Sequence, residues 1–129
     1  MSKHPISLLR QSPYGFATLT GRVDPTRKGV EKAINEKRFS KQVMDRDYEA
    51  VKADIISKAS DPDEQNRLMY EYHNERVAEL VRTRSSWDVQ NDPHPIQVNQ
   101  FSQVIAGNHR FRAARYLDME EIEVSVVQE

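Results

Sequence analysis

The chain has 129 residues, a formal net charge of −1 and no cysteine. The missing cysteine excludes disulfides, thiolate metal sites and a cysteine nucleophile, and the near-zero charge confines any nucleic-acid contact to a local basic patch. The length predicts a single domain over residues 1–129. Because the sequence contains no apolar stretch of membrane-spanning length, we expect no membrane partner and a cytoplasmic protein.

The first third of the chain predicts short strands followed by a basic helix. Residues 4–10 form an apolar run suited to a first strand, a turn follows over 11–15, and 16–23 suits either an edge strand or a loop. Asp24 as N-cap and Pro25 as the first helical residue predict the start of the helix. It opens the most basic stretch of the chain, whose cations are Arg27, Lys28, Lys32, Lys37 and Arg38.

The clearest helix is predicted over residues 41–58. Met44, Tyr48, Val51 and Ile55 recur at spacings of four, three and four, so they form one apolar stripe. Such a stripe is typical of a helix face that packs into a core.

A second long helix is predicted over residues 62–84. Asp61 is placed to cap it, Pro62 suits the first helical position, and Glu64 lies where the acid of a capping box belongs. His73 lies within the apolar stripe, where a hydrogen-bonded core residue is the ordinary role and a ligand role is the alternative. The stripe consists of Met69, Tyr72, Val77, Leu80 and Val81.

The last third alternates in the manner of strands. Trp87 lies in the predicted loop, where it either covers the edge of the core or stacks on the base of a bound nucleotide. The predicted elements are a loop over 85–95, a strand at 96–98, a turn over 99–102, a strand over 103–106 and a last strand over 122–126.

The most informative stretch is residues 104–117, which predict a strand, a tight turn and a helix. Gly107 permits a turn that a side chain would obstruct, and Phe111, Ala114 and Leu117 share one face of the following helix. The amino end of this helix brings backbone N–H groups together with imidazole and guanidinium groups, which are the parts of a phosphate site. The alternative is that Asn108 caps a surface helix whose arginines face solvent.

Three consecutive pieces of the last third of the chain together resemble the nucleotide-binding core of the ParB/sulfiredoxin superfamily. They are Pro95-Ile-Gln-Val, then Val104-Ile-Ala-Gly-Asn-His-Arg-Phe-Arg-Ala-Ala-Arg-Tyr-Leu, and finally Ile122-Glu-Val. The resemblance covers about residues 95–127. It implies an α+β fold, in which helices pack on a small mixed sheet and the helix at 62–84 is inserted before the signature hairpin.

The resemblance also implies a ligand and a set of site residues. Gly107, Asn108, His109, Arg110 and Arg112 would surround the phosphates of ATP or CTP, with Mg²⁺ bound through those phosphates, and His109 is the candidate for proton transfer. A further cation would come from Arg22 or Arg38. No spacing of acidic residues identifies a metal-ligand set of the protein's own.

The chain departs from the superfamily pattern at positions that bear on which of the superfamily's activities it could have. Sulfiredoxin activity is excluded because the chain has no cysteine, and Asn108 stands where partition proteins commonly have glutamate. Three functions are therefore predicted as alternatives: a nucleotide-binding domain that hydrolyses or transfers phosphate or cuts DNA, a non-catalytic protein-interaction factor from a plasmid, phage or accessory region, and a nucleic-acid-binding module. The helix at 62–84 also offers a surface for a homodimer.

Overall fold

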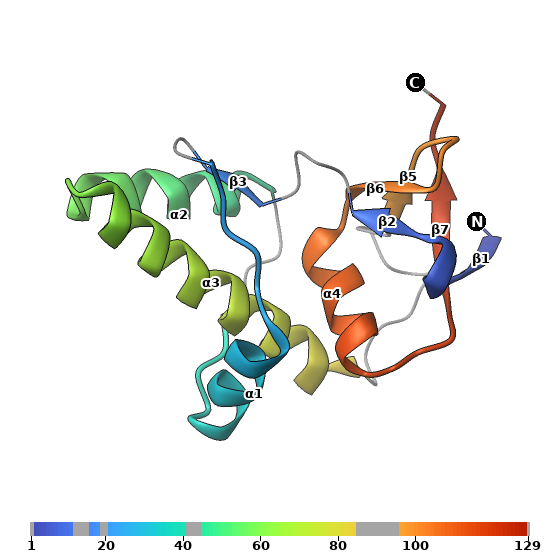
Figure 1. Cartoon of the computed structure of the whole chain (residues 1–129), viewed down its shortest axis with the longest axis horizontal. Coiled ribbons are helices and arrows are strands. Elements are labelled where there is room, and N and C mark those ends of the chain that lie inside the picture. Colours follow the sequence, from blue (N-terminus) through green and yellow to red (C-terminus); the bar gives the residue numbers. More distant parts are fainter. Residues whose placement is uncertain (1, 12–15, 19–20, 41–44, 85–95, 129) are drawn as a thin grey trace. The chain divides into compact units, whose positions relative to one another are not determined.

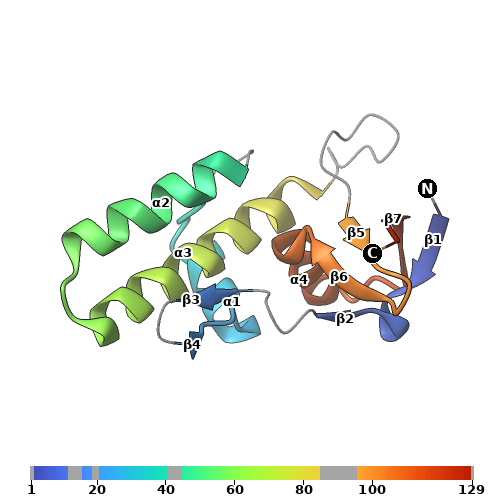
Figure 2. The same ribbon diagram turned by 90° about the horizontal axis from the view of Figure 1, so that it is seen from above.

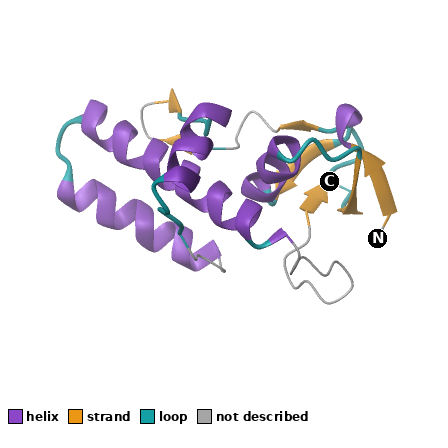
Figure 3. Cartoon of the chain, turned by 90° about the horizontal axis from the view of Figure 1, so that it is seen from below, coloured by secondary structure: helices purple, strands orange, loops and turns teal. Residues whose placement is uncertain are grey.

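The computed structural model describes residues 2–11, 16–18, 21–40, 45–84 and 96–128. The chain divides into two compact units, the first made of Met1–Phe16 and Leu80–Glu129 and the second of Ala17–Glu79. By residue range, the larger sheet belongs to the first unit and most of the helical residues belong to the second; Figure 3 distinguishes the helices from the strands by colour. The single domain expected from the length of the chain stays a prediction.

The first unit is built on a mixed five-stranded sheet. Its strand order is β1-β7-β5-β6-β2, with β1 antiparallel to β7, β7 parallel to β5, β5 antiparallel to β6 and β6 parallel to β2. Together with the four α-helices of the described residues, this sheet confirms the predicted α+β class. The strands are β1 (Ser2–Pro5), β2 (Arg10–Gln11), β5 (Ile96–Val98), β6 (Gln103–Ala106) and β7 (Glu121–Val126).

The prediction of one continuous strand over residues 4–10 was wrong. The chain forms β1, then a 3₁₀ turn at Ile6–Leu8, and then β2 on the opposite edge of the sheet. Ile6 and Leu9 are three residues apart and both pack into the core, which is the spacing of a 3₁₀ turn and not of a strand. The Ile6 N–H donates to the Glu120 carbonyl at 2.9 Å and holds this crossing in place.

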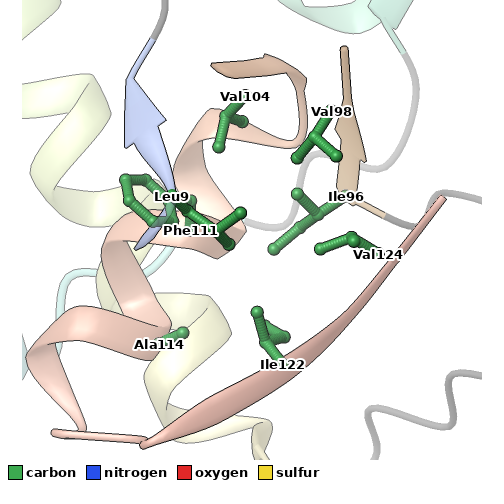
Figure 4. Close-up of a cluster of buried hydrophobic side chains, with 8 residues drawn as sticks. All are labelled: Leu9, Ile96, Val98, Val104, Phe111, Ala114, Ile122 and Val124. Atoms are coloured by element: carbon green, nitrogen blue, oxygen red, sulfur yellow. The ribbon is translucent and has the colours of Figure 1, made fainter. Parts of the chain in front are cut away.

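The core of the first unit lies between the sheet and helix α4 (Asn108–Tyr116). Figure 4 shows the side chains of α4 directed toward those of the strands. Phe111 is 1% exposed and Ala114 is fully buried, as the predicted apolar face requires, whereas Leu117 is only half-buried. The buried cluster consists of Leu9, Ile96, Val98, Val104, Phe111, Ala114, Ile122 and Val124.

In its described residues, the second unit contains a small hairpin, two helices and most of a third (Figures 1 and 2). The hairpin strands β3 (Ala17–Thr18) and β4 (Gly21–Arg22) pair antiparallel with each other, which favours the strand alternative for residues 16–23. The helices are α1 (Arg27–Asn35), α2 (Asp45–Lys58) and α3 (Pro62–Arg82).

Helices α2 and α3 pack through the predicted apolar stripes. Ile55 of α2 is buried against Met69 and Tyr72 of α3, and Val51 packs at the edge of this cluster. Met44, the first residue of the predicted stripe, lies outside the described residues. No helix in the described part of the chain is long and apolar enough to cross a membrane.

The cap predicted for α3 is present, but the capping box is not. The Asp61 side chain accepts a hydrogen bond from the Asp63 N–H at 2.9 Å. The Glu64 carboxylate instead accepts hydrogen bonds from Arg67, one turn further along the helix. The favourable local pairing of Glu64 with Arg67 therefore replaces the predicted box.

Helix α1 begins two residues later than the sequence predicted, because α3 holds its cap. Thr26, not Asp24, is the N-cap, and its Oγ1 accepts from the Gly29 N–H at 3.0 Å. The Thr26 N–H donates to Asn74 Oδ1 at 3.1 Å, and Thr26 Oγ1 lies 2.7 Å from the Tyr70 hydroxyl. Both partners of Thr26 belong to α3, so they cannot be found from the local sequence.

We expect Gly29→Ala to destabilise the protein even though alanine is the better helix former. A Cβ at this position would overlap with Asn74 Nδ2 and would lie 2.6 Å from the Tyr70 hydroxyl. The side chains of Asn74 and Tyr70 are the ones that hold Thr26. Overpacking of this kind costs about 1–3 kcal/mol. Thermal unfolding checks it, with Asn35→Ala at an exposed position of α1 as the control. A melting temperature that rises equally in both variants would contradict the close contact.

The stability of the protein should fall as the pH drops from 6.5 toward 4. His73 is fully buried, and burial lowers its pKa to about 4, although the charge of Asp24 acts in the opposite direction. In the unfolded chain the His73 imidazole therefore binds a proton near pH 6.5, whereas in the folded chain it stays neutral until about pH 4. The stability that is present above pH 6.5 is consequently lost as the pH falls toward 4. The lowered pKa of His73 corresponds to a contribution of about 3 kcal/mol to the free energy of unfolding.

Urea unfolding at several pH values checks this contribution as a difference between variants, since carboxylates also titrate in part of this range. We expect His73→Gln to reduce the loss of unfolding free energy between pH 6.5 and pH 4. His4→Gln, which removes a histidine from β1, should leave that loss unchanged. Identical pH profiles for the wild type and His73→Gln would show that this imidazole is not the cause.

Candidate functional site

The turn between β6 and α4 requires glycine for two separate reasons. Gly107 has φ 85° and ψ 32°, in the left-handed region that side chains disfavour. A Cβ on Gly107 would also lie 3.0 Å from Ile96 Cα and 3.1 Å from Ile96 Cγ1. The backbone of the turn thus packs directly on β5, and the turn predicted at Gly107 is present.

Gly107 is the N-cap of α4, so no cap side chain covers the amino end of this helix. The alternative in which Asn108 caps the helix was wrong, because Asn108 is already its first residue. Its Oδ1 is buried, and no group in the described residues donates a hydrogen bond to it. The first turn of α4 therefore presents the positive end of a helix dipole without a carboxylate or hydroxyl from the cap residue.

His109 and Arg112 of α4 both contact Phe16. The rings of His109 and Phe16 meet edge to face, with centroids 5.1 Å apart and planes at 65°. The Arg112 guanidinium carbon lies 5.9 Å from the centroid of the Phe16 ring, within the range of a cation–π contact. Its Nε donates to Gln11 Oε1 at 2.7 Å. Arg112 is thus held from two sides, and its Nε is already engaged within the protein.

Gln11 and Phe16 are site residues that the sequence did not reveal. Gln11 is 101 positions from Arg112, and neither Gln11 nor Phe16 lies in a motif of its own. Phe16 is 5% exposed and has φ 60°, a left-handed conformation that a bulky residue adopts only where tertiary contacts impose it. These contacts arise from the fold of the first unit.

The arginines of α4 differ in their surroundings. Arg110 is half-buried in the first turn, next to the Gly107 cap. Arg115 lies in the last turn and is exposed, with its guanidinium carbon 5.7 Å from the centroid of the Phe111 ring. Arg110 is therefore the arginine of this helix placed closest to its amino end.

The additional cations predicted for the site lie in the second unit. Arg38 follows α1, and its Nη1 lies 2.6 Å from Glu75 Oε2, while its Nε lies 3.4 Å from Glu36. Arg22 belongs to β4, and Trp87 lies outside the described residues. The structure therefore brings the predicted residues at 107–112 together on one turn and the start of one helix, whereas Arg38 is engaged in ion pairs of its own. Within the described ranges, no three His, Asp or Glu side chains are grouped to hold a metal ion.

A family model described as the ParB N-terminal domain matches residues 40–129, which include α2, α3, the β5–β6 hairpin, α4 and β7. No curated protein and no solved structure matches the chain.

Substitution of Gly107 should destabilise the first unit. Gly107→Ala combines a left-handed backbone with the contact on Ile96, and we expect a loss of about 1–3 kcal/mol in unfolding free energy. Gly107→Asn separates the two causes, because asparagine tolerates φ above zero but still carries a Cβ. Chemical denaturation should show both variants weakened. A fully stable Gly107→Asn would mean that β5 does not restrict this turn.

Proposed function

The chain belongs to the ParB N-terminal domain family, and from that membership we propose that it is a ParB-like, DNA-related module that binds nucleotide phosphates at the amino end of α4. The family match covers the whole β6–α4 turn, so the proposal concerns the part of the chain that carries the match.

One observation carries the proposal: α4 starts at a left-handed glycine with no capping side chain. Backbone N–H groups at such a helix start attract anions, and the helix dipole adds to the attraction. The same turn places the imidazole of His109 and the guanidinium of Arg110 within the first three residues of the helix. A phosphate group suits this combination because it accepts several charge-assisted hydrogen bonds at once.

The neighbouring side chains of α4 have different proposed roles in such a site. Arg110 is the proposed phosphate ligand, since a guanidinium donates two parallel hydrogen bonds to phosphate oxygens. Arg112 is the proposed positioning residue, because Gln11 and Phe16 already hold its guanidinium. His109, whose ring packs against Phe16, is a second phosphate donor or the group that moves a proton.

The proposed ligand is ATP or CTP. A triphosphate uses more of the available positive charge than a monophosphate does, and Mg²⁺ accompanies it through the phosphate oxygens. Binding of this kind serves either a catalytic role, which is hydrolysis, phosphate transfer or DNA cleavage, or a regulatory role in plasmid or phage functions without chemistry.

The test is calorimetric titration of ATP and CTP, each with and without Mg²⁺, into the wild type, Arg110→Ala and Arg115→Ala. A lost charge-assisted hydrogen bond costs about 1.5–3 kcal/mol, so Arg110→Ala should bind at least tenfold more weakly. Arg115→Ala is the matched control, because it removes the same charge from the exposed last turn of the same helix.

Equal affinity in the two variants, or no binding by the wild type, would remove the proposed site. Where binding is present, release of phosphate and cleavage of plasmid DNA are then compared between the wild type and His109→Ala. Activity that depends on His109 supports the catalytic role, and unchanged binding without any turnover supports the regulatory one.

A further inference from the structure

Charge is unevenly distributed within the second unit and the short segment that leads out of α1. Residues 22–41 contain seven basic and three acidic side chains, a formal charge of +4, whereas residues 45–79 contain five basic and ten acidic side chains, a formal charge of −5. The positive charge is thus concentrated in the stretch of the sequence that contains α1. This helix precedes residues 40–129, the range of the family match.

Helix α1 turns an apolar face inward and a lysine-bearing face outward. Val30 and Ala33 are buried, and the Gly29 backbone lies close to Asn74 of α3. The opposite face carries Lys28 and Lys32, which are four residues apart and therefore separated by about 6 Å along the helix axis. We call this face, made of Lys28, Glu31, Lys32 and Asn35, the lysine face of α1; all four side chains are exposed.

The lysines of this face make no ion pair with any described residue. By contrast, Lys58 on α2 pairs with Asp54 at 2.9 Å, and Arg38 pairs with Glu75. Like charges four residues apart on a helix repel each other by a few tenths of a kcal/mol. An external anion that bridges Lys28 and Lys32 would relieve this repulsion.

The lysine face is also held in a defined orientation. Thr26 at the start of α1 is bound by Asn74 and by Tyr70 of α3, and Asn74 is itself buried. Because these bonds lock the amino end of α1 onto α3, the lysines project from a fixed helix and not from a flexible tail.

We infer that the lysine face of α1 binds the phosphate backbone of nucleic acid. Charge complementarity is the argument, since successive phosphates along a strand match a row of cations, and such interfaces are polar and positive. A lipid surface fits poorly, because a helix that lies in a membrane needs exposed apolar residues to insert, whereas Val30 and Ala33 of α1 are buried and Ile34 is half-buried. A protein partner fits poorly as well, because its interface would be expected to centre on aromatic or apolar anchors, of which this face has none.

This inference goes beyond the proposed nucleotide site and is independent of it. The lysine face belongs to the second unit and the β6–α4 turn to the first. A phosphate-backbone contact carries no base specificity of its own, so binding should be weak and independent of sequence. Loss of the nucleotide site should therefore leave DNA binding by the lysine face unchanged.

The experiment is fluorescence anisotropy of the full chain with a labelled 20-base-pair DNA duplex over a series of salt concentrations. Each phosphate contact contributes about 0.9 to the slope of log K against log salt. The double variant Lys28→Ala/Lys32→Ala should therefore lower the slope by about 2. The matched control is Lys52→Ala/Lys58→Ala, which removes the same charge from α2 of the same unit. Arg115→Ala, in the exposed last turn of α4, should retain DNA binding.

A second variant raises the affinity and so cannot be explained by misfolding. Glu31 is the one acid on the lysine face, and Glu31→Gln should strengthen DNA binding and leave the thermal stability unchanged. Equal slopes in the two double variants, no binding by the wild type at 50 mM salt, or weaker binding by Glu31→Gln would overturn the inference. So would a loss of binding to anionic phospholipid vesicles in Lys28→Ala/Lys32→Ala with DNA binding intact.

Discussion

At the end of β6 the backbone of Gly107 passes so close to Ile96 that a Cβ on it would lie 3.0 Å from Ile96 Cα. This contact sets the point at which α4 leaves the sheet, and with it the direction in which Phe111 and Ala114 enter the core. The same glycine leaves the amino end of α4 without a capping side chain. Packing of the first unit and the anion-attracting end of its helix therefore depend on one residue, and neither feature can change without the other.

Side chains from the amino-terminal part of the chain complete this arrangement. Gln11 and Phe16 come from residues that precede the second unit, yet they hold Arg112 and cover His109. An arginine held in this way is more useful for orienting its neighbours than for moving toward a ligand. The left-handed backbone of Phe16 is the conformational cost of this contact.

The second unit depends on polar contacts between helices as much as on apolar ones. Thr26 joins α1 to α3 through a partly buried hydrogen bond to Asn74 and an exposed one to Tyr70. Asn74 is itself buried, and a buried polar group left unsatisfied costs about 1–3 kcal/mol. His73 is buried beside Asn74, and its depressed pKa follows from the same burial. Because these bonds fix which side of α1 faces outward, they also determine where Lys28 and Lys32 are displayed.

The sequence by itself determined the family, the α+β class, the α4 face with Phe111 and Ala114, and the turn at Gly107, because each rests on contacts or spacings within a few residues. Only the tertiary structure decided the rest. The first strand is broken because Ile6 and Leu9 turn toward one core from opposite edges of the sheet. The contacts of Arg112 likewise cross about a hundred residues of chain, and such long-range pairings leave no period or motif in a single sequence.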